Sequence, residues 1–469
     1  MKPPLCALAH SRCARRVAGL LLAAFSCLAV TPPGGWGALV PTQEPEYGPA
    51  STAAARLQWL REARFGMFIH WGIYSVLGHG EQPLYRELLN NSEYQRLAGQ
   101  FKAERFDPDA WMRTARAAGM KYAVLTAKHH DGFCLWDTAT TDYNAVKTGA
   151  RRDLVGDYVK ACRKAGLRVG LYFSLADWSI PAHFAGPKKN PDGWASFIDL
   201  THRQVEELVT RYGQVDLLWF DGANYFSGDD WQSGRLVAMI QRHQPEIVIN
   251  NRLPKPKAGG NWGYDTPEQR IGNLSTNFWE SCITSTRKFW GYHVSHEDPS
   301  MWYPEREVLE TFVRVAANNG NLLWNVGPRA DGTLPKLYQD RTRLVGAWLR
   351  KNGEAIYGTT GAPFEFAYGG VMSQRDRDLY LFFLYWPGTE YSLPGFKQKL
   401  ASASFLVGGK KIEAVQEPHR IVLKGLPRKA PDLVTVVKLT FDAKPEPHEW
   451  AKKRLWQINL EGMEEWARK

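Results

Sequence analysis

The sequence contains few cysteines for its length. Six occur in 469 residues, and three of these lie within the first 38 residues. The other three, Cys134, Cys162 and Cys282, are an odd number and form no Cys-x-x-Cys pair. This pattern excludes a disulfide-rich scaffold and a zinc ribbon, and it leaves a single disulfide between Cys134 and Cys282 open.

Other patterns are also missing. No Gly-x-Gly-x-x-Gly opens a predicted helix, so a dinucleotide site is not expected. Residues 1–38 hold four basic residues and no acidic ones, so excluding them lowers the net charge from +11 to +7. Lys and Arg form no stripe, and a nucleic-acid partner is therefore not expected. After residue 38, no stretch is long and apolar enough to span a membrane.

The first 38 residues have the layout of a secretory signal peptide. Basic residues precede an apolar run, Val17–Val30, and small residues follow at Gly37 and Ala38. We therefore expect a secreted or periplasmic protein, or a lysosomal one in a eukaryotic host. A twin-arginine signal at Arg15-Arg16 and a lipid anchor at Cys27 are alternatives, although residues 24–26 fit a lipobox poorly.

Apolar strand-like runs alternate with helix-like stretches from about residue 59 to residue 357. Continuously apolar strands in such an alternation are typical of βαβ units, and so an α/β fold is expected. About 300 residues of this alternation favour a (β/α)8-like TIM barrel, at residues 45–356, over an open doubly wound sheet. The predicted strands are 65–72, 121–128, 168–174, 215–220, 246–251 and 321–328. The helix signal is poor at 72–106 and 253–287, where long loops are expected to build the site.

The pattern changes after residue 356. Short apolar runs at 378–385, 404–407, 420–423 and 433–441 are separated by Gly, Pro and Lys. They predict an all-β sandwich over residues 357–469, and its last part is a charged tail.

Polar residues occur where the predicted barrel strands end. The buried stretch Leu217–Phe220 is followed by Asp221 and Gly222, and in a TIM barrel the carboxyl ends of the strands form the catalytic face. An Asp-Gly turn whose carboxylate caps its own backbone is the alternative. Folding alone does not require polar residues at each strand end, so we predict an active site. Its other members are His70, His129, His130, Tyr172 and Arg252.

Two chemistries suit these residues. One is metal-dependent hydrolysis, because His and Asp bind zinc. No second His follows His70 at a spacing of two, and the adjacent His129 and His130 should point to opposite faces of a strand. The other is glycoside hydrolysis, which in a retaining enzyme needs two carboxylates about 5–5.5 Å apart. Asp221 fits one role, and Glu268 and Glu280 are candidates for the other.

Seven motifs in order give the sequence a family resemblance. They are FGMFIHWG at 65–72, KHHDGF at 128–133, GLYFS at 170–174, WFDG at 219–222, WESC at 279–282, WGY at 290–292 and NGNLLWNVGP at 319–328. Together they resemble the α-L-fucosidases of glycoside hydrolase family 29. The resemblance implies a barrel followed by a β-sandwich. It also implies release of terminal α-L-fucose from fucosylated glycans, with retention through a covalent fucosyl-enzyme, and no metal or other cofactor.

The resemblance also implies roles for single residues. Asp221 matches the nucleophile, and Trp290 matches an aromatic residue beside the apolar side of the sugar. The segment 266–269 resembles the one that carries the acid/base in the α-1,3/4-selective branch, which favours Glu268. Glu280 is the rival, and its other possible role is to orient a His or an Arg. The residues that match contacts to fucose are His70, His129, His130, Tyr172 and Arg252.

One position departs from the family pattern. Many members have a Glu-Trp pair in the loop after the first strand, and here Glu81 stands in for the Glu but Gln82 follows it. This difference again favours the α-1,3/4-selective branch. A fucose-binding protein without catalysis is the alternative of a different class, and a homo-oligomeric state stays open.

Overall fold

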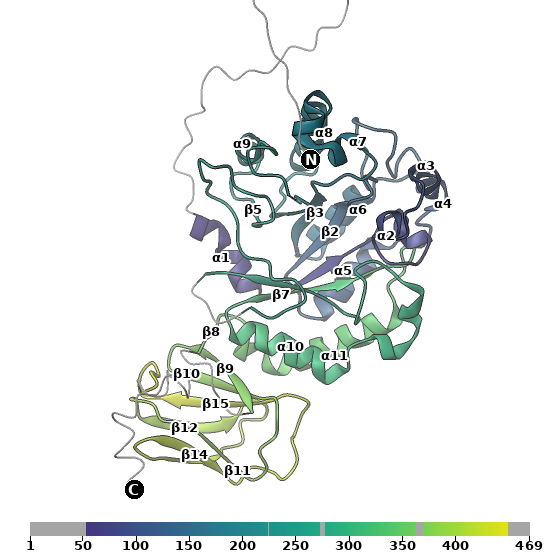
Figure 1. Cartoon of the computed structure of the whole chain (residues 1–469). Coiled ribbons are helices and arrows are strands. Elements are labelled where there is room, and N and C mark those ends of the chain that lie inside the picture. Colours follow the sequence, from purple (N-terminus) through teal and green to yellow (C-terminus); the bar gives the residue numbers. More distant parts are fainter. Residues whose placement is uncertain (1–52, 224, 273–276, 363–368, 449–469) are drawn as a thin grey trace, which may run out of the picture. The chain divides into compact units, whose positions relative to one another are not determined.

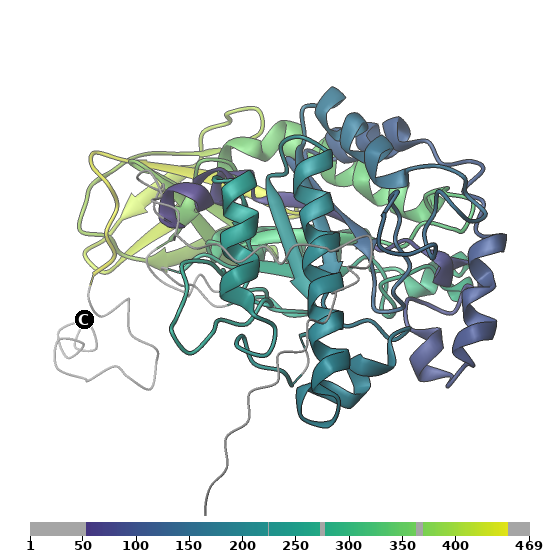
Figure 2. The same ribbon diagram turned by 90° about the horizontal axis from the view of Figure 1, so that it is seen from above.

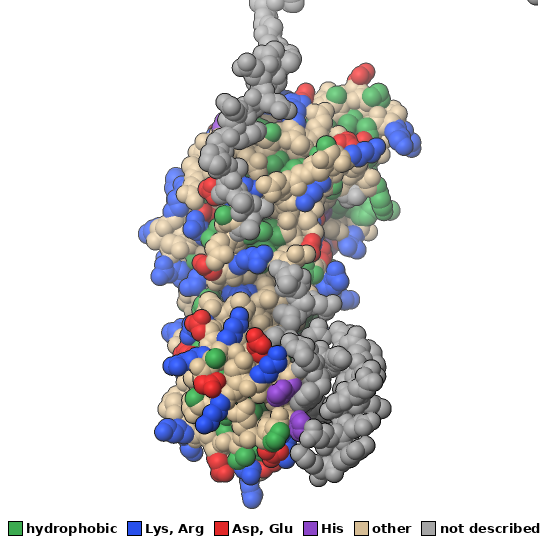
Figure 3. All heavy atoms as spheres, turned by 90° about the vertical axis from the view of Figure 1, so that its left-hand side faces the viewer, with side chains coloured by type: hydrophobic (Ala, Val, Ile, Leu, Met, Phe, Trp, Pro, Cys, Tyr) green, Lys and Arg blue, Asp and Glu red, His purple; other side chains and the backbone are tan. Residues whose placement is uncertain are grey.

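The structure, a computed structural model, describes residues 53–223, 225–272, 277–362 and 369–448. The predicted signal peptide at 1–38 and the end of the charged tail, from residue 449, lie outside these ranges. In the described ranges, no helix has both the length and the apolar character needed to cross a membrane. Basic and acidic side chains are interspersed on the face that Figure 3 shows.

A parallel seven-stranded sheet confirms the predicted TIM-like fold (Figure 1). Its strand order is β5-β4-β3-β2-β1-β7-β6. The strands are almost wholly buried, which explains why their sequences are apolar without alternation. They are β1 (Phe65–Ile69), β2 (Tyr122–Lys128), β3 (Arg168–Ser174), β4 (Leu217–Asp221), β5 (Val248–Ile249), β6 (Glu280–Thr284) and β7 (Asn321–Val326).

An irregular extended segment, residues 263–269, lies between β5 and β6. On one side, Gly263 N donates to Ile249 O at 3.1 Å and Asn251 N donates to Tyr264 O at 3.1 Å. On the other side, backbone N–H groups of β6 donate to Asp265 O at 2.8 Å and to Pro267 O at 3.2 Å. This closing segment therefore occupies the eighth position of the barrel, although it is not a regular strand.

Strand β6 lies within residues 253–287, for which a long loop is predicted from the sequence. Its residues are buried but include Ser281 and Thr284, so the apolar pattern is interrupted. Both hydroxyls are satisfied inside the protein, Ser281 Oγ by Arg270 O at 2.7 Å and Thr284 Oγ1 by Thr286 O at 2.6 Å. Because the polar side chains of β6 find hydrogen-bond partners inside the protein, its sequence is not a continuous apolar run. This explains why the sequence did not predict β6 as a strand.

The main helices connect the barrel strands, and aspartates cap two of them. Asp107 caps α5 by accepting from Ala110 N at 2.9 Å, and Asp153 caps α6 by accepting from Gly156 N at 2.8 Å. Helices α8 and α9 lie side by side, as the view from above shows (Figure 2). The six helices are α5 (Pro108–Ala117), α6 (Leu154–Lys164), α8 (Pro191–Arg211), α9 (Ser233–His243), α10 (Glu305–Ala317) and α11 (Lys336–Asn352).

Shorter elements fill the connections. No helix lies between β5 and β6 among the residues described there, whereas the loop after β1 holds several short helices. Helix α1 (Ala53–Ala63) precedes β1, and the short helices are α2 (Pro83–Arg86), α3 (Asn91–Gln95), α4 (Leu97–Gln100), α7 (Pro181–Lys189), η1 (Ile73–Val76), η2 (Val294–Glu297), η3 (Pro299–Met301) and η4 (Gly353–Ala355).

Two antiparallel sheets follow the barrel, as predicted. A five-stranded sheet has the order β12-β15-β10-β9-β8, and a three-stranded sheet has the order β11-β14-β13. Leu379, Leu381 and Phe383 of the first sheet share a hydrophobic core with Leu393 and Leu423 of the second. The strands are β8 (Thr360–Gly361), β9 (Gly370–Arg375), β10 (Asp378–Phe383), β11 (Glu390–Pro394), β12 (Leu400–Phe405), β13 (Glu413–Gln416), β14 (Arg420–Lys424) and β15 (Thr435–Phe441).

Strand β10 is buried on both faces because the sandwich packs on the barrel. Tyr380 and Phe382, which alternate with its sandwich-facing residues, belong to the same hydrophobic cluster as the barrel core. The Trp348 indole of α11 donates to Val434 O at 2.8 Å across this contact. The barrel and the sandwich form one compact unit.

Candidate active site

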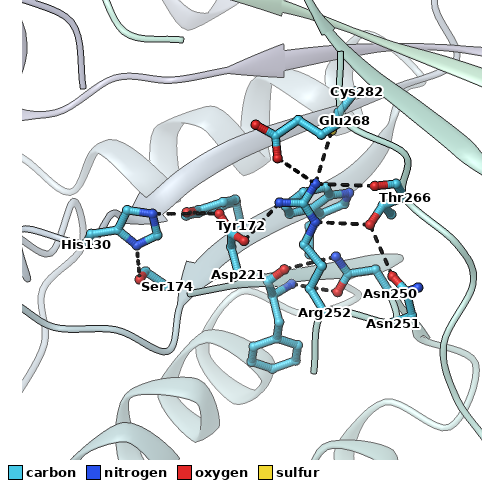
Figure 4. Close-up of polar contacts among 12 residues, drawn as sticks. His130, Tyr172, Ser174, Asp221, Asn250, Asn251, Arg252, Thr266, Glu268 and Cys282 are labelled. Carbon is cyan, nitrogen blue, oxygen red and sulfur yellow. Dashed lines mark hydrogen bonds and ion pairs between the residues drawn. The ribbon is translucent and has the colours of Figure 1, made fainter. Parts of the chain in front are cut away.

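The polar residues predicted at the strand ends lie together at the carboxyl end of the barrel. Figure 4 shows His130, Tyr172, Asp221 and Arg252 among them. His129 and His130 follow β2, Tyr172 lies in β3, Asp221 ends β4, and Arg252 follows β5. Because all the strands are parallel, their carboxyl ends meet at the same end of the barrel. The arrangement brings a carboxylate, a guanidinium, a phenol and imidazoles into contact.

Asp221 is the centre of this arrangement. Its Oδ2 accepts from the Tyr172 hydroxyl at 3.0 Å, and His130 Nε2 lies 3.7 Å from the same oxygen. Its Oδ1 accepts from Arg252 Nη1 at 3.0 Å. Burial raises the pKa of Asp221, but the charge and the hydrogen bond of Arg252 outweigh burial and hold this pKa below its usual value. The carboxylate is therefore ionised at neutral pH.

Gly222 allows the chain to turn directly after Asp221. Its φ is +70°, and an added Cβ would lie 2.9 Å from the Ala176 Cβ and 3.0 Å from the Ser174 Oγ. Only glycine fits this position without displacing the neighbouring strand end. The backbone thus changes direction directly after β4, and the Asp221 carboxylate contacts Tyr172 and Arg252 rather than only its own backbone.

Arg252 joins two carboxylates. Besides its contact with Asp221, its Nη2 donates to Glu268 Oε2 at 3.0 Å. Thr266 of the closing segment holds the same guanidinium through its hydroxyl, 3.1 Å from Nε, and through its carbonyl oxygen, 3.3 Å from Nη2. The guanidinium also lies 4.5 Å above the Trp219 ring. Figure 4 shows Arg252 between Asp221 and Glu268.

Glu268 lies on the closing segment, where it forms a parallel bridge with Cys282 of β6. Its side chain is 46% exposed, in contrast to the other polar groups of the site. The structure therefore brings Glu268 and Asp221 onto one guanidinium and leaves the Glu268 carboxylate accessible to solvent.

Glu280 occupies a different place. It is the first residue of β6, at the amino end of the strand, and it is fully buried. Its carboxylate accepts from the Tyr122 hydroxyl, from Trp219 Nε1 at 3.0 Å and from the Tyr264 hydroxyl at 3.0 Å. Burial raises its pKa to about 7, although the three donors lower it. Glu280 thus fixes the indole of Trp219, whose ring lies below Arg252.

The three histidines are neutral. Burial lowers the pKa of His70 to about 3, and burial likewise lowers the pKa of His129 and His130. The expectation that His129 and His130 point to opposite faces is wrong, because β2 ends at Lys128 and their ring centroids are only 4.3 Å apart. Among the described residues, no three His, Cys, Asp or Glu side chains are arranged to hold a metal ion.

Glu81 and Trp290 contact each other close to His70. Glu81 is buried, and its Oε2 accepts from Trp290 N at 2.8 Å and Gly291 N at 3.0 Å. The Trp290 ring lies 5.1 Å from the His70 ring. Asn325 connects the two, since it contacts His70 Nδ1 at 2.7 Å and donates to Trp290 O at 2.7 Å. Glu81 therefore positions the Trp290 loop.

The sequence profile of the α-L-fucosidase family matches residues 40–354. The chain belongs to this family. The tissue α-L-fucosidase of Rattus norvegicus is 32% identical over 425 residues, which cover 84% of this chain and 91% of the relative. The human tissue enzyme is 32% identical over 357 residues, covering 70% of this chain and 76% of that enzyme.

Solved structures agree with this assignment. α-L-Fucosidase isoenzyme 1 from Paenibacillus thiaminolyticus has a TM-score of 0.78 and 34% identity, covering 84% of this fucosidase and all of the bacterial chain. A family 29 α-L-fucosidase from Bacteroides thetaiotaomicron, trapped as a covalent intermediate with 2-fluoro-fucosyl fluoride, has a TM-score of 0.75 and 28% identity, covering 83% and 96% of the two chains.

Several residues at the site of this fucosidase were not singled out from the sequence. Ser174 contacts His130 Nδ1 at 2.6 Å, and the Trp178 ring lies 5.0 Å from the His130 ring. Thr266 and Asn325 position Arg252 and His70, respectively. Ser174 and Asn325 fall inside motifs already identified, so their proximity to strand ends could have indicated them. Trp178 lies in a loop, where the sequence carries no comparable signal.

The cysteines of the described residues are free. Cys134, Cys162 and Cys282 are all buried thiols, so the disulfide left open between Cys134 and Cys282 is not formed. Cys282 instead lies against the site, 3.5 Å from Arg252 Nη2.

Proposed function

We propose that this α-L-fucosidase retains the anomeric configuration, with Asp221 as the nucleophile and Glu268 as the acid/base. The observation that carries the proposal is the single guanidinium of Arg252, which contacts both carboxylates at 3.0 Å. The charge of Arg252 keeps Asp221 ionised, as a nucleophile must be. The contact of Arg252 with Glu268 also holds a second carboxylate near Asp221.

The first step forms a bond between Asp221 and the anomeric carbon while the glycosidic bond breaks. Glu268 gives its proton to the departing oxygen, which leaves as the hydroxyl of the remaining glycan. Because Glu268 must carry a proton at this moment, it turns from Arg252 to the glycosidic oxygen, while Arg252 keeps its contact with Asp221. The product of this step is a β-linked fucosyl ester.

The second step releases fucose. Glu268, now ionised, takes a proton from a water molecule, and the oxygen of that water attacks the anomeric carbon as the bond to Asp221 breaks. The exposure of the Glu268 side chain supports this role, because both the leaving glycan and the water must reach it. Glu280 has no such access, since it is fully buried among three donors.

The remaining residues hold the sugar. His70, His129, His130 and Tyr172 surround the position next to Asp221, with neighbouring rings 4.3–5.6 Å apart. Their neutral imidazoles can both donate to and accept from sugar hydroxyls. The partly buried Trp290 offers an apolar ring for the less polar side of fucose.

The stereochemical course tests this proposal directly. Proton NMR of the reaction with an aryl α-L-fucoside should show α-L-fucose as the first product, before mutarotation produces the β anomer. A first-formed β anomer would contradict a double displacement at Asp221.

We also propose a preference for α-1,3 and α-1,4 linkages. The linkage proposal is supported by the segment 266–269 and by Glu81, which is followed by Gln82 rather than Trp. A panel of α-1,2, α-1,3, α-1,4 and α-1,6 fucosylated oligosaccharides tests it, and a preference for α-1,2 or α-1,6 would contradict it.

We further propose that the N-terminal segment 1–38 directs export. N-terminal sequencing of the exported protein tests whether residues 1–38 are removed.

A further inference from the structure

Two aromatic rings extend from the site to the surface. Tyr85 on α2 and Trp178 after β3 have ring centroids 5.3 Å apart and planes inclined by 33°. On its other side, Trp178 lies 5.0 Å from the ring of His130. His130 in turn lies 3.7 Å from Asp221. A continuous line of rings therefore leads away from the proposed nucleophile.

The Trp178 ring is carried by a braced loop. Its backbone N–H donates to His130 O at 2.7 Å. The preceding residue, Asp177, accepts from Ser179 N at 3.0 Å and from Ser179 Oγ at 2.5 Å, and it forms an ion pair with the buried Lys128 at 3.4 Å. These contacts fix the loop before any ligand binds, which lowers the entropy that binding must remove.

Tyr85 is open to solvent although it is stacked on a neighbour. It is 58% exposed, whereas the preceding residue, Leu84, is 7% exposed and packs into the barrel core cluster. An exposed aromatic pair beside an active site offers a flat, uncharged surface with polar edges, which suits a neutral ring with one apolar face. A sugar of the glycan has such a face, formed by its C–H groups.

We propose that Tyr85 and Trp178 form a subsite for a second, neutral sugar ring of the fucosylated glycan. This inference rests on the proposed function only in that it requires release of fucose from a glycan. The fucose itself lies beside His70, His129 and Tyr172, and the second ring lies on the Tyr85–Trp178 pair beyond His130. The pair thereby favours binding of glycans over simple fucosides, which have no second sugar.

The test compares two substrates in one set of variants. kcat/KM is measured on α-L-fucosyl fluoride, which has no second sugar, and on the oligosaccharide that the wild type hydrolyses fastest in the linkage panel. Tyr85→Ala should lower the ratio of oligosaccharide to fluoride by about tenfold, whereas Tyr85→Phe should change it by less than about twofold. Leu88→Ala is the matched control, because Leu88 is 86% exposed in the same loop.

A direct binding measurement accompanies the kinetics. The defucosylated oligosaccharide should inhibit hydrolysis of the fluoride, and its inhibition constant should rise about tenfold in Tyr85→Ala. An unchanged ratio, or an equal loss on both substrates, would overturn the subsite. The proposed retaining mechanism fails instead on the anomer of the first product, so the two failures are distinguishable.

Discussion

Arg252 Nη1 lies 3.0 Å from Asp221 Oδ1, and this ion pair decides the charge of the carboxylate. Burial acts in the opposite direction and raises the pKa of Asp221. The guanidinium donates to Thr266 and stacks over the Trp219 ring, so it is fixed in place. The charge at the end of β4 is therefore set by a residue that follows β5.

Replacing Arg252 should change the pH dependence of hydrolysis. In Arg252→Met, burial is no longer outweighed, so the pKa of Asp221 rises. Protonation then removes the nucleophile at a higher pH, and the acidic limb of kcat/KM should move up by about one pH unit or more. The pH profile with an aryl fucoside measures this shift. Arg270→Met, at an exposed position of the same loop, should leave the limb unchanged.

Replacing Asp221 should abolish turnover. Asp221→Gly removes the attacking oxygen, and kcat should fall by at least about a thousandfold. Added azide should enter the vacant space, attack the anomeric carbon directly and give β-L-fucosyl azide, which NMR identifies. Asp376→Gly, in a turn of the distant sandwich, is the control and should keep its activity. Activity near the wild-type level in Asp221→Gly would refute the assignment.

The two glutamates should differ in their response to the leaving group. Glu268→Ala should slow the hydrolysis of oligosaccharides far more than that of α-L-fucosyl fluoride, because fluoride leaves without a proton. Azide should then intercept the ester on Asp221 and give α-L-fucosyl azide. If Glu280→Ala shows this pattern and Glu268→Ala does not, Glu280 is the acid/base.

Glu280 should make stability depend on pH. Burial raises its pKa from 4.5 to about 7, so the folded state favours the neutral acid. Its contribution to stability is complete below the unfolded pKa and is lost as the pH rises through about 7, a change of about 3 kcal/mol.

Glu280→Gln removes this titration while it keeps the shape of the side chain. The melting temperature of this variant, relative to the wild type, should therefore rise between about pH 5 and about pH 8. Thermal unfolding at the two pH values measures the difference. A relative melting temperature that is constant with pH would show that Glu280 does not titrate in this range.

The regular parts of the fold were predictable because each has a local cause. Asp107 caps a helix with a contact that is local in the sequence, because its side chain needs only Ala110 N three residues later. The apolar strands were likewise evident, because they are buried on both faces. Strand β6 and the closing segment were not, because Ser281 and Thr284 depend on partners that only the folded chain supplies.

The site was predictable to the extent that it follows strand ends. Asp221, Tyr172 and Arg252 come together because parallel strands deliver their last residues to one place. The relation of His129 to His130 was mistaken, since strand alternation does not continue past Lys128. Trp178 was missed because its place depends on a loop that Asp177 and Lys128 brace from different parts of the chain.

The irregular closing segment has a consequence for evolution. Asp221 lies on a strand whose ladder with β3 fixes its register, so the proposed nucleophile cannot shift along the chain without turning its neighbours to the wrong face. Glu268 lies on a segment that has no regular ladder and no helix behind it among the residues described there. We therefore expect this part of the chain to vary more in length and sequence than β4, so that the proposed acid/base can come from different sequence positions while the proposed nucleophile stays in place.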